Sequence, residues 1–245
     1  MKITTNVVYE HLQNSDKKII VEQGGTRSGK TYNILIWLIF NYCGSHEGKT
    51  ITICRRTFPA VRGTVMRDFF HILKHYKLYY EELHSKSRSE YNLNNNRVEF
   101  ISIDQPTRIR GRKRDILFIN ECNELDWESW NQLIFRTQER IIIDYNPSDE
   151  FHWIYDKVLT REDTAFFQTT YRDNPFLEET LVKEIERLKG IDDNYWRVYG
   201  LGERGQNRSL VFAFQTTKEI PEEAKLVSRG LDFGYSNDPS CLIET

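Results

Sequence analysis

The sequence predicts an α/β fold with a mainly parallel central sheet flanked by helices, and three observations lead to this prediction. Short, nearly continuous apolar runs at 115–120 and 139–144 are typical of strands that are covered on both faces. Helical patterns separate such runs along the chain, and this alternation of strand and helix is the signature of an α/β fold. Of the 245 residues, 39% are hydrophobic and 13% aromatic, which indicates a globular rather than a disordered chain.

Local sequence patterns predict the positions of the individual strands and helices. Apolar or β-branched runs bounded by turn residues predict strands at 18–23, 50–55, 89–95, 97–103, 115–120, 139–144, 165–170 and 228–234. The two strands within 89–103 are expected to pair through a turn at Asn94, Asn95 and Asn96. Helical patterns predict helices at 31–43, from about 64 to 77, at 127–136 and at 178–190. The first of these is apolar nearly all round, which predicts a buried helix, and a turn is expected at Pro59.

Charge and composition exclude several classes of protein. The chain has 34 basic and 36 acidic residues, and its net charge of −2 disfavours a protein that coats nucleic acid over most of its surface. A local DNA contact stays open, because residues 108–114 (RIRGRKR) are mostly basic. The longest apolar run, 34–40, is too short to cross a membrane, and no signal peptide is recognisable. We therefore expect a cytosolic protein.

Cysteine spacing and glycine content bear on the organisation of the chain. Cys43, Cys54, Cys122 and Cys241 lack metal-ligand spacing, so we expect them to pack in the core of a protein from a reducing compartment. The polar, glycine-rich stretch at 200–207 predicts a domain boundary. We expect one domain at 1–205, followed at 206–245 by a linker and the first strand or strands of a second domain that the chain does not complete.

Residues 24–31, with the sequence GGTRSGKT, match the phosphate-binding pattern G-x-x-x-x-G-K-S/T. A strand is expected before the loop and a helix after it, as this pattern requires. Glycines let the backbone form a concave nest whose N–H groups face phosphate oxygens, and the helix adds the positive end of its dipole. Lys30 is expected to bind the β- and γ-phosphates and the Thr31 hydroxyl to coordinate Mg²⁺. The expected nucleotide contacts are Gly24, Gly25, Thr26, Arg27, Ser28, Gly29, Lys30 and Thr31.

The end of a second predicted strand indicates which class of P-loop protein the sequence encodes. The apolar run 116–119 ends in Asn120 and Glu121, and in P-loop ATPases with a glutamate-activated water such a strand lies beside the loop. The penultimate acid of that strand holds the metal through a water, and the following glutamate is the general base. Asn120 replaces the usual aspartate, so its amide oxygen can accept from a metal-bound water but brings no charge. Glu121 fits the base role; a solvent-facing carboxylate is the alternative.

The nucleotide is expected to be ATP, because the sequence lacks the N-K-x-D motif that reads guanine and shows no lid signature of small-molecule kinases. Arg55 and Arg56 end the second strand at the carboxyl edge of the sheet, where ligands of open α/β sheets bind. The expected fold is thus a P-loop NTPase of the RecA/ASCE-like type, with ATP and Mg²⁺ as its cofactors.

In their order along the chain, these segments resemble the ATPase half of the large subunit of tailed-phage terminases, the motors that package viral DNA. Besides the loop, the resemblance includes residues 54–65 (CRRTFPAVRGTV), 116–125 (ILFINECNEL), 141–148 (IIIDYNPS), 169–177 (TTYRDNPFL) and 195–205 (YWRVYGLGERG). Residues 230–240 (GLDFGYSNDPS) resemble the first strand of the family's RNase H-like nuclease domain. Only the loop is specific on its own; the ordered set is much stronger.

The resemblance implies roles for particular residues. Arg27 would contact the γ-phosphate from within the loop, and Arg110 would be an arginine finger that reaches the ATP of a neighbouring subunit. Asn146 would sense the γ-phosphate or position the attacking water. Asp232 would be the first metal-binding acid of the nuclease domain. Asn-Glu is a family variant of Asp-Glu, so Asn120 is expected to contact Mg²⁺ through water.

Other interpretations of these residues stay open. Arg27 could be a surface charge, and the run 108–114, with Arg110 and Arg112, could be a solvated face or a DNA contact. Asn146 could form a strand-ending Asn-Pro turn, and Asp232 could be a strand-end carboxylate without a metal. Because a two-metal nuclease needs several converging acids, no nuclease activity is expected from this chain.

The resemblance further implies ATP hydrolysis that drives double-stranded DNA into a procapsid. The expected partners are double-stranded DNA, further copies of the chain in a ring on the procapsid portal, and the small terminase subunit. No membrane is expected, and the location is the cytoplasm of an infected bacterium. One rival is a helicase-type DNA translocase, which predicts a second P-loop-like or arginine-bearing domain in the same chain. The other is an interaction module switched by nucleotide, which has no need of a base at Glu121.

Overall fold

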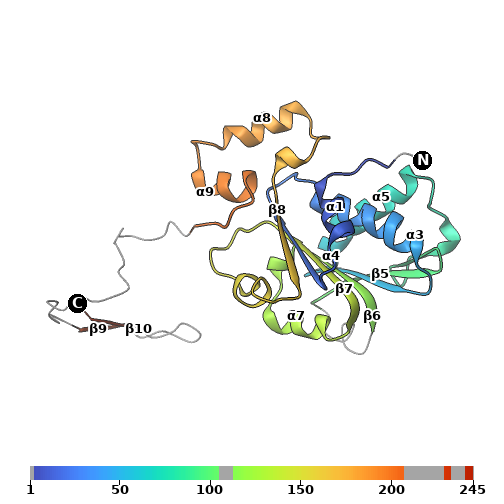
Figure 1. The fold of residues 1–245 in the computed structure, drawn as a ribbon, viewed down its shortest axis with the longest axis horizontal. Helices are drawn as coiled ribbons and strands as arrows, with labels where there is room; N and C mark the ends of the chain where they lie inside the picture. Colours follow the sequence, from blue (N-terminus) through green and yellow to red (C-terminus); the bar gives the residue numbers. More distant parts are fainter. Residues whose placement is uncertain (1–2, 105–112, 207–228, 233–240, 245) are drawn as a thin grey trace. The chain divides into compact units, whose positions relative to one another are not determined.

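The computed structural model describes residues 3–104, 113–206, 229–232 and 241–244 (Figure 1). The chain divides into two units, Met1–Asn207 and Arg208–Thr245.

The described strands of the first unit form one sheet, in the order β3-β4-β5-β2-β6-β7-β1-β8. All neighbouring pairs from β5 to β8 are parallel, whereas β3 and β4 form an antiparallel edge. The strands are β1 (Ile19–Gly24), β2 (Thr50–Arg55), β3 (His84–Ser85), β4 (Glu90–Leu93), β5 (Asn96–Ser102), β6 (Arg114–Asn120), β7 (Thr137–Tyr145) and β8 (Thr164–Thr169). The predicted α/β class and the mainly parallel sheet are confirmed.

Helices lie on both faces of this sheet (Figure 1). One face carries α1 (Val7–Asn14), α2 (Lys30–Ile36), the π-helical turn η1 (Trp37–Tyr42), α3 (Cys43–Ser45), α4 (Phe58–Val61), η2 (Arg62–Met66) and α5 (Arg67–His75). The opposite face carries α7 (Trp127–Ile134) and η5 (Ile154–Val158). A smaller cluster joins α8 (Glu179–Arg187) and η7 (Trp196–Gly200), and α9 (Asp193–Tyr195) directly precedes η7. The short turns are η3 (Glu81–Leu83), η4 (Cys122–Glu124) and η6 (Tyr171–Asp173).

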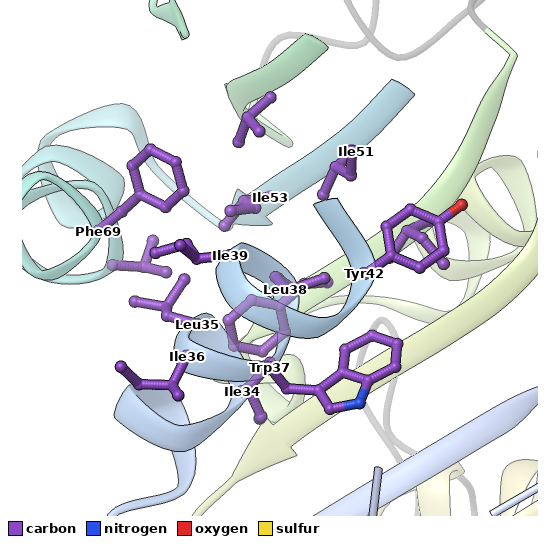
Figure 2. Packing of buried hydrophobic residues seen from close by; sticks show 14 of the residues in the cluster. Ile34, Leu35, Ile36, Trp37, Leu38, Ile39, Tyr42, Ile51, Ile53 and Phe69 are labelled. Carbon is purple, nitrogen blue, oxygen red and sulfur yellow. The ribbon is translucent and has the colours of Figure 1, made fainter. Parts of the chain in front are cut away.

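Alternate residues of the strands supply two separate cores. Figure 2 shows Leu35 and Phe69 from the helices packing with Ile53 of β2. The next residue along β2, Cys54, belongs to the opposite core with Trp130 of α7. Because both faces are buried, the strands need apolar residues at successive positions, which explains the continuous apolar runs of the sequence.

The predicted hairpin is present, and its turn has the expected chemistry. Strands β4 and β5 pair antiparallel, and the two residues between them, Asn94 and Asn95, have positive φ angles of 49° and 59°. Two-residue hairpin turns of this kind require positive φ at both positions, and asparagine tolerates it better than most residues.

Two local predictions were wrong. Pro59 lies in the first turn of α4 rather than in a turn of its own, so helical structure begins at Phe58 and not near residue 64. The first helical turn has no partner for its N–H groups, so the missing N–H of proline costs nothing there. Cys241 is exposed, whereas the other three cysteines are buried as predicted.

In the second unit, β9 (Arg229–Asp232) and β10 (Cys241–Glu244) form an antiparallel pair, and β9 corresponds to the strand expected at 228–234. The start of a nuclease domain in this unit, and the boundary at 205/206, stay predictions. None of the helices among the described residues is long and apolar enough to cross a membrane.

Candidate active site

The predicted phosphate-binding loop joins the end of β1 to the start of α2, and Lys30 folds back over it. Its Nζ donates to the carbonyl oxygens of Gly24 (3.0 Å) and Gly25 (2.9 Å) and lies 3.4 Å from Oδ1 of Asn146. Lys30 is only 7% exposed, and burial lowers its pKa against the attraction of the nearby carboxylates, first that of Asp144. The loop therefore encloses a buried lysine beside a cluster of acidic groups.

The glycines at the start of the loop allow close approach by other segments. A Cβ at Gly24 would lie 2.5 Å from the carbonyl oxygen of Thr169, and one at Gly25 would lie 2.6 Å from that of Tyr199. The N–H groups of Gly25 and Thr26 donate to these same two carbonyls, at 2.9 and 2.8 Å. These two groups were predicted to face phosphate, but here they donate to the last residue of β8 and to η7.

Asp144, which was not predicted from the sequence, is the centre of the polar cluster. The Thr31 hydroxyl donates to its Oδ2 (2.5 Å), and Asn120 Nδ2 (2.9 Å) and the Glu121 backbone N–H (3.0 Å) donate to its Oδ1. Asp144 is 1% exposed and lies opposite Asn120 in the parallel pairing of β6 and β7. The sequence did contain an indication of this contact, because neighbouring parallel strands bring the residues at their carboxyl ends to the same edge of the sheet.

The orientation of Asn120 differs from the prediction. Its Nδ2 faces Asp144 and lies 3.3 Å from the Thr31 hydroxyl, whereas its Oδ1 faces the Thr64 hydroxyl at 3.5 Å. The amide oxygen that was expected to accept from a metal-bound water is thus turned away from Thr31. The reason is that a carboxylate only accepts hydrogen bonds, so Asp144 selects the amide N–H.

The strand that carries Asn120 is not a direct neighbour of the loop strand. Strand β7 pairs with both β1 and β6 and therefore separates them. The end of β6 is still beside the loop, as expected, because Asn120 reaches Thr31.

Glu121 has a strained backbone and a perturbed side chain. Its φ of 52° is in the left-handed region, which is uncommon for a residue with a Cβ and is often found at functional sites. Burial first, and then the Asp144 carboxylate, raise the pKa of Glu121 to about 7, against the pull of Lys30 and Arg55. A carboxylate with a pKa near the working pH is suited to general base chemistry. The alternative of a freely solvated carboxylate is therefore disfavoured.

The arginines that were predicted to lie at this edge of the sheet differ in their surroundings. Arg55, at the end of β2, forms a two-point ion pair with Glu124, with distances of 3.0 Å from Nε and 2.6 Å from Nη2. Arg56 and Arg27 are exposed, and Arg27 has a φ of 60°. Arg110 and Arg112 lie outside the described residues, as does the side chain of Asp232.

Segments remote in sequence hold the loop in place. Asn6 donates through Nδ2 to the Ser28 carbonyl and through its backbone N–H to Asn33 Oδ1, both at 2.9 Å. Asn174 donates through Nδ2 to the Arg27 carbonyl at 2.8 Å. A cavity of about 380 Å³ opens beside the loop, lined in part by Gly29, Tyr32, Asn33, Tyr76, Asn174 and Phe176. These hydrogen bonds join segments 22 or more residues apart, so no local pattern could predict them.

The residues at this edge fit Mg²⁺ bound together with a nucleotide. The Thr31 hydroxyl and the carboxylates near it supply oxygen atoms, and Mg²⁺ prefers oxygen ligands. Among the described residues, no group of three or more His, Cys, Asp and Glu side chains could hold a metal by itself. This agrees with the usual Mg²⁺ site of nucleotide enzymes, which uses one or two carboxylates together with phosphates and waters.

Fold and site together define a nucleotide-binding protein of the P-loop class, with the loop at the carboxyl edge of a parallel sheet. The family model described as "Phage terminase large subunit" matches residues 16–203. The chain belongs to this family, so the resemblance of its ATPase segments to large terminase subunits is confirmed.

Two curated relatives come from Bacillus subtilis and from a Bacillus phage. The chain is 23% identical to the PBSX phage terminase large subunit of Bacillus subtilis (strain 168), over 90% of this chain and 59% of the relative. It is 24% identical to the terminase large subunit of Bacillus phage SPP1, over 91% of this chain and 59% of the relative. The chain thus spans little more than half the length of these proteins.

Solved structures of large terminases have the same fold. The large terminase of a thermophilic bacteriophage in complex with ADP superposes with a TM-score of 0.65 at 19% identity, over 80% of this chain and 51% of that chain. The ATPase domain of the Thermus phage P74-26 large terminase gives a TM-score of 0.60 at 18% identity, over 82% of this chain and 94% of that domain. The P-loop type of the fold is thereby confirmed.

Proposed function

We propose that this chain is the ATP-hydrolysing motor domain of a phage terminase that drives double-stranded DNA into a procapsid. One observation carries the proposal: the buried Lys30 of the phosphate-binding loop lies in one polar cluster with Thr31, Asp144 and Glu121. Structures of the thermophilic bacteriophage's large terminase with ADP and with ATP-gamma-S support nucleotide binding by this fold.

The side chains divide the work of hydrolysis. Lys30 would exchange its contacts to the Gly24 and Gly25 carbonyls for the β- and γ-phosphates. The distance of 3.4 Å from its Nζ to Asn146 Oδ1 supports a role for that amide near the γ-phosphate. Thr31 would coordinate Mg²⁺, which would neutralise charge on the phosphates when bound. Glu121 takes the proton of the attacking water. Arg27, on the exposed side of the loop, contacts the γ-phosphate.

The cavity beside Gly29 is the proposed pocket for the adenine base. Phe176, 55% exposed, and Tyr32, 39% exposed, supply aromatic surface at its rim. Phe176→Ala is expected to weaken ATP binding about tenfold, since base–aromatic stacking contributes roughly 1–3 kcal/mol. Equilibrium binding of a fluorescent ATP analogue measures the change.

Two controls isolate the base contact. Inorganic triphosphate has no base, so its competition for the site should be the same with Phe176→Ala as with the wild type. Phe135, 81% exposed at the end of α7, provides a matched substitution, and Phe135→Ala should bind ATP normally. Equal losses for ATP and triphosphate would place the base elsewhere.

Arg110 is proposed to act on the ATP of a neighbouring subunit. Arg110→Ala is then expected to bind ATP but to be nearly inactive alone, because an arginine finger contributes about 10³–10⁵ in rate. Mixed with Glu121→Gln, it should regain activity, because a site with an intact Glu121 receives arginine from its neighbour. If co-assembled mixtures stay inactive at every ratio, Arg27 becomes the preferred arginine and Arg110 a DNA or surface contact.

The proposed partners are double-stranded DNA, further copies of the chain in a ring on the portal, and the small terminase subunit, in the cytoplasm of an infected bacterium. Steady-state ATPase activity at several protein concentrations, with and without double-stranded DNA, tests the motor function. Activity should rise faster than linearly with concentration where assembly is limiting, and DNA should stimulate it. ATP binding without turnover under any of these conditions would favour a nucleotide-switched interaction module instead.

A further inference from the structure

Asp144 is a charged group of the cluster around Thr31, and its particular role has not yet been assigned. It lies on β7, the strand between the loop strand β1 and the strand β6, which ends at Asn120. The pairings place it opposite Glu22 of β1 on one side and opposite Asn120 of β6 on the other. Its carboxylate is 1% exposed and is therefore held by the protein rather than by solvent.

The three hydrogen bonds of Asp144 point to a metal site. One carboxylate oxygen accepts from the hydroxyl of Thr31, at 2.5 Å, which is the group expected to coordinate Mg²⁺. A threonine that gives a lone pair to a cation still needs an acceptor for its hydroxyl proton, and Asp144 provides it. The other oxygen accepts from Asn120 Nδ2 and from the Glu121 N–H, which fixes the carboxylate beside Thr31.

Asn120 complements Asp144 rather than weakening the site. An aspartate at position 120 would lie beside Asp144 and next to Glu121, and three carboxylates so close would repel one another. The amide instead donates a hydrogen bond to Asp144, which an aspartate in its ionised form could not do. The site thus has its negative charge on Asp144 of β7 and not at the facing position 120, at the end of β6.

We propose that Asp144 is the anionic residue that holds Mg²⁺ at the nucleotide site, in the place that an aspartate at position 120 would otherwise take. This proposal rests on the proposed function, because the Mg²⁺ would arrive with the nucleotide.

Metal binding, rather than turnover, tests the assignment. Mn²⁺ serves as the spectroscopic probe: electron paramagnetic resonance measures free Mn²⁺ in the presence of the chain and ADP. Asp144→Asn has the same shape and is expected to lower Mn²⁺ affinity by about 10- to 100-fold, as loss of a group that orients a metal ligand typically does. Its affinity for ADP in EDTA should stay within about twofold of the wild type, since phosphate binding by Lys30 and the loop is untouched.

An exchange of the two residues gives the sharper test. The double variant Asn120→Asp/Asp144→Asn returns one carboxylate and one amide to the pair and should recover most of the Mn²⁺ affinity lost in Asp144→Asn. Glu22→Gln is the matched control, a buried carboxylate on the neighbouring strand that contacts His11 and not Thr31. It should leave Mn²⁺ binding unchanged, and thermal melting of every variant checks folding.

The results of these experiments distinguish a failure of the Asp144 assignment from a failure of the proposed nucleotide-binding function. Wild-type Mn²⁺ affinity in Asp144→Asn, or an equal loss in Glu22→Gln, overturns the assignment. Failure of the double variant to recover affinity also overturns it, provided that the variant melts like the wild type. Absence of ADP binding by the wild-type chain, with or without metal, would instead refute the nucleotide-binding function itself.

Discussion

Lys30→Ala is expected to reduce ATP hydrolysis to background and to weaken ATP binding by about 10- to 100-fold. The ammonium group is the point charge that the loop offers to the β- and γ-phosphates, and a hydrogen bond to a charged group contributes about 1.5–3 kcal/mol. Its Nζ also contacts the Gly24 and Gly25 carbonyls and the Ser28 hydroxyl, so the loop loses its internal clamp as well. Hydrolysis is measured as phosphate release and binding by titration with a fluorescent ATP analogue.

Folding and binding must be separated for this variant, because Lys30 is buried beside carboxylates. Lys30→Met keeps most of the apolar stem and should melt close to the wild type in the absence of nucleotide. Addition of ATP should raise the melting temperature of the wild type, by linkage, but not that of either variant. Lys17→Ala, at an exposed lysine that contacts the Glu162 carbonyl, is the control and should hydrolyse ATP normally. Turnover near the wild-type rate in Lys30→Ala would refute the P-loop assignment.

The fold was predictable because its signals are local and repeated. The runs at 115–120 and 139–144 are apolar because both faces of β6 and β7 are covered, and that burial is visible without knowledge of the partners. The phosphate-binding loop was predictable for a related reason, since all of its residues lie in one segment between a strand and a helix. Pro59 was misplaced because proline is compatible both with a turn and with the first turn of a helix.

The residues of the site could be predicted only where a local pattern within one continuous segment of the sequence marks them. Glu121 and Asn146 were found because each directly follows a strand, but Asp144 was missed although it lies in the same run as Asn146. Its importance depends on the pairing of β7 with β6, which brings it opposite Asn120. The same holds for the contact of Tyr199 with Thr26, which joins residues far apart in the chain. Sequence patterns indicate which residues reach the edge of the sheet, whereas hydrogen bonding decides which of them face each other.

The pair of Asn120 and Asp144 also shows why a motif can differ from its usual form without loss of chemistry. Binding of the cation requires one carboxylate beside Thr31. The carboxyl ends of the adjacent parallel strands β6 and β7 offer two facing positions for it, 120 and 144. Desolvation makes it costly to fill both positions with buried carboxylates next to Glu121, whose pKa is already raised by burial and by Asp144. An amide at one position and a carboxylate at the other satisfies both requirements.

Glu121→Gln is expected to leave ATP binding intact and to reduce the hydrolysis rate by about 10²–10⁴, the usual contribution of a general base. The amide keeps the size of the side chain but cannot accept a proton from the attacking water. Folding should not suffer, because burial and the Asp144 carboxylate already disfavour the charged form of Glu121. Single-turnover measurements with saturating enzyme separate the chemical step from binding, and Glu128→Gln, at an exposed position in α7, is the control.

The two large effects differ in kind, and this difference distinguishes a working ATPase site from a loop that merely binds phosphate. Removal of Lys30 should lower both binding and rate, whereas the change at Glu121 should lower the rate alone and leave ATP trapped in the site. In a single-turnover experiment, Glu121→Gln should therefore retain bound ATP rather than ADP. If the variant instead lost ATP binding and kept the rate per bound ATP, Glu121 would be a structural residue. Its left-handed backbone would then serve only to begin the turn that follows β6.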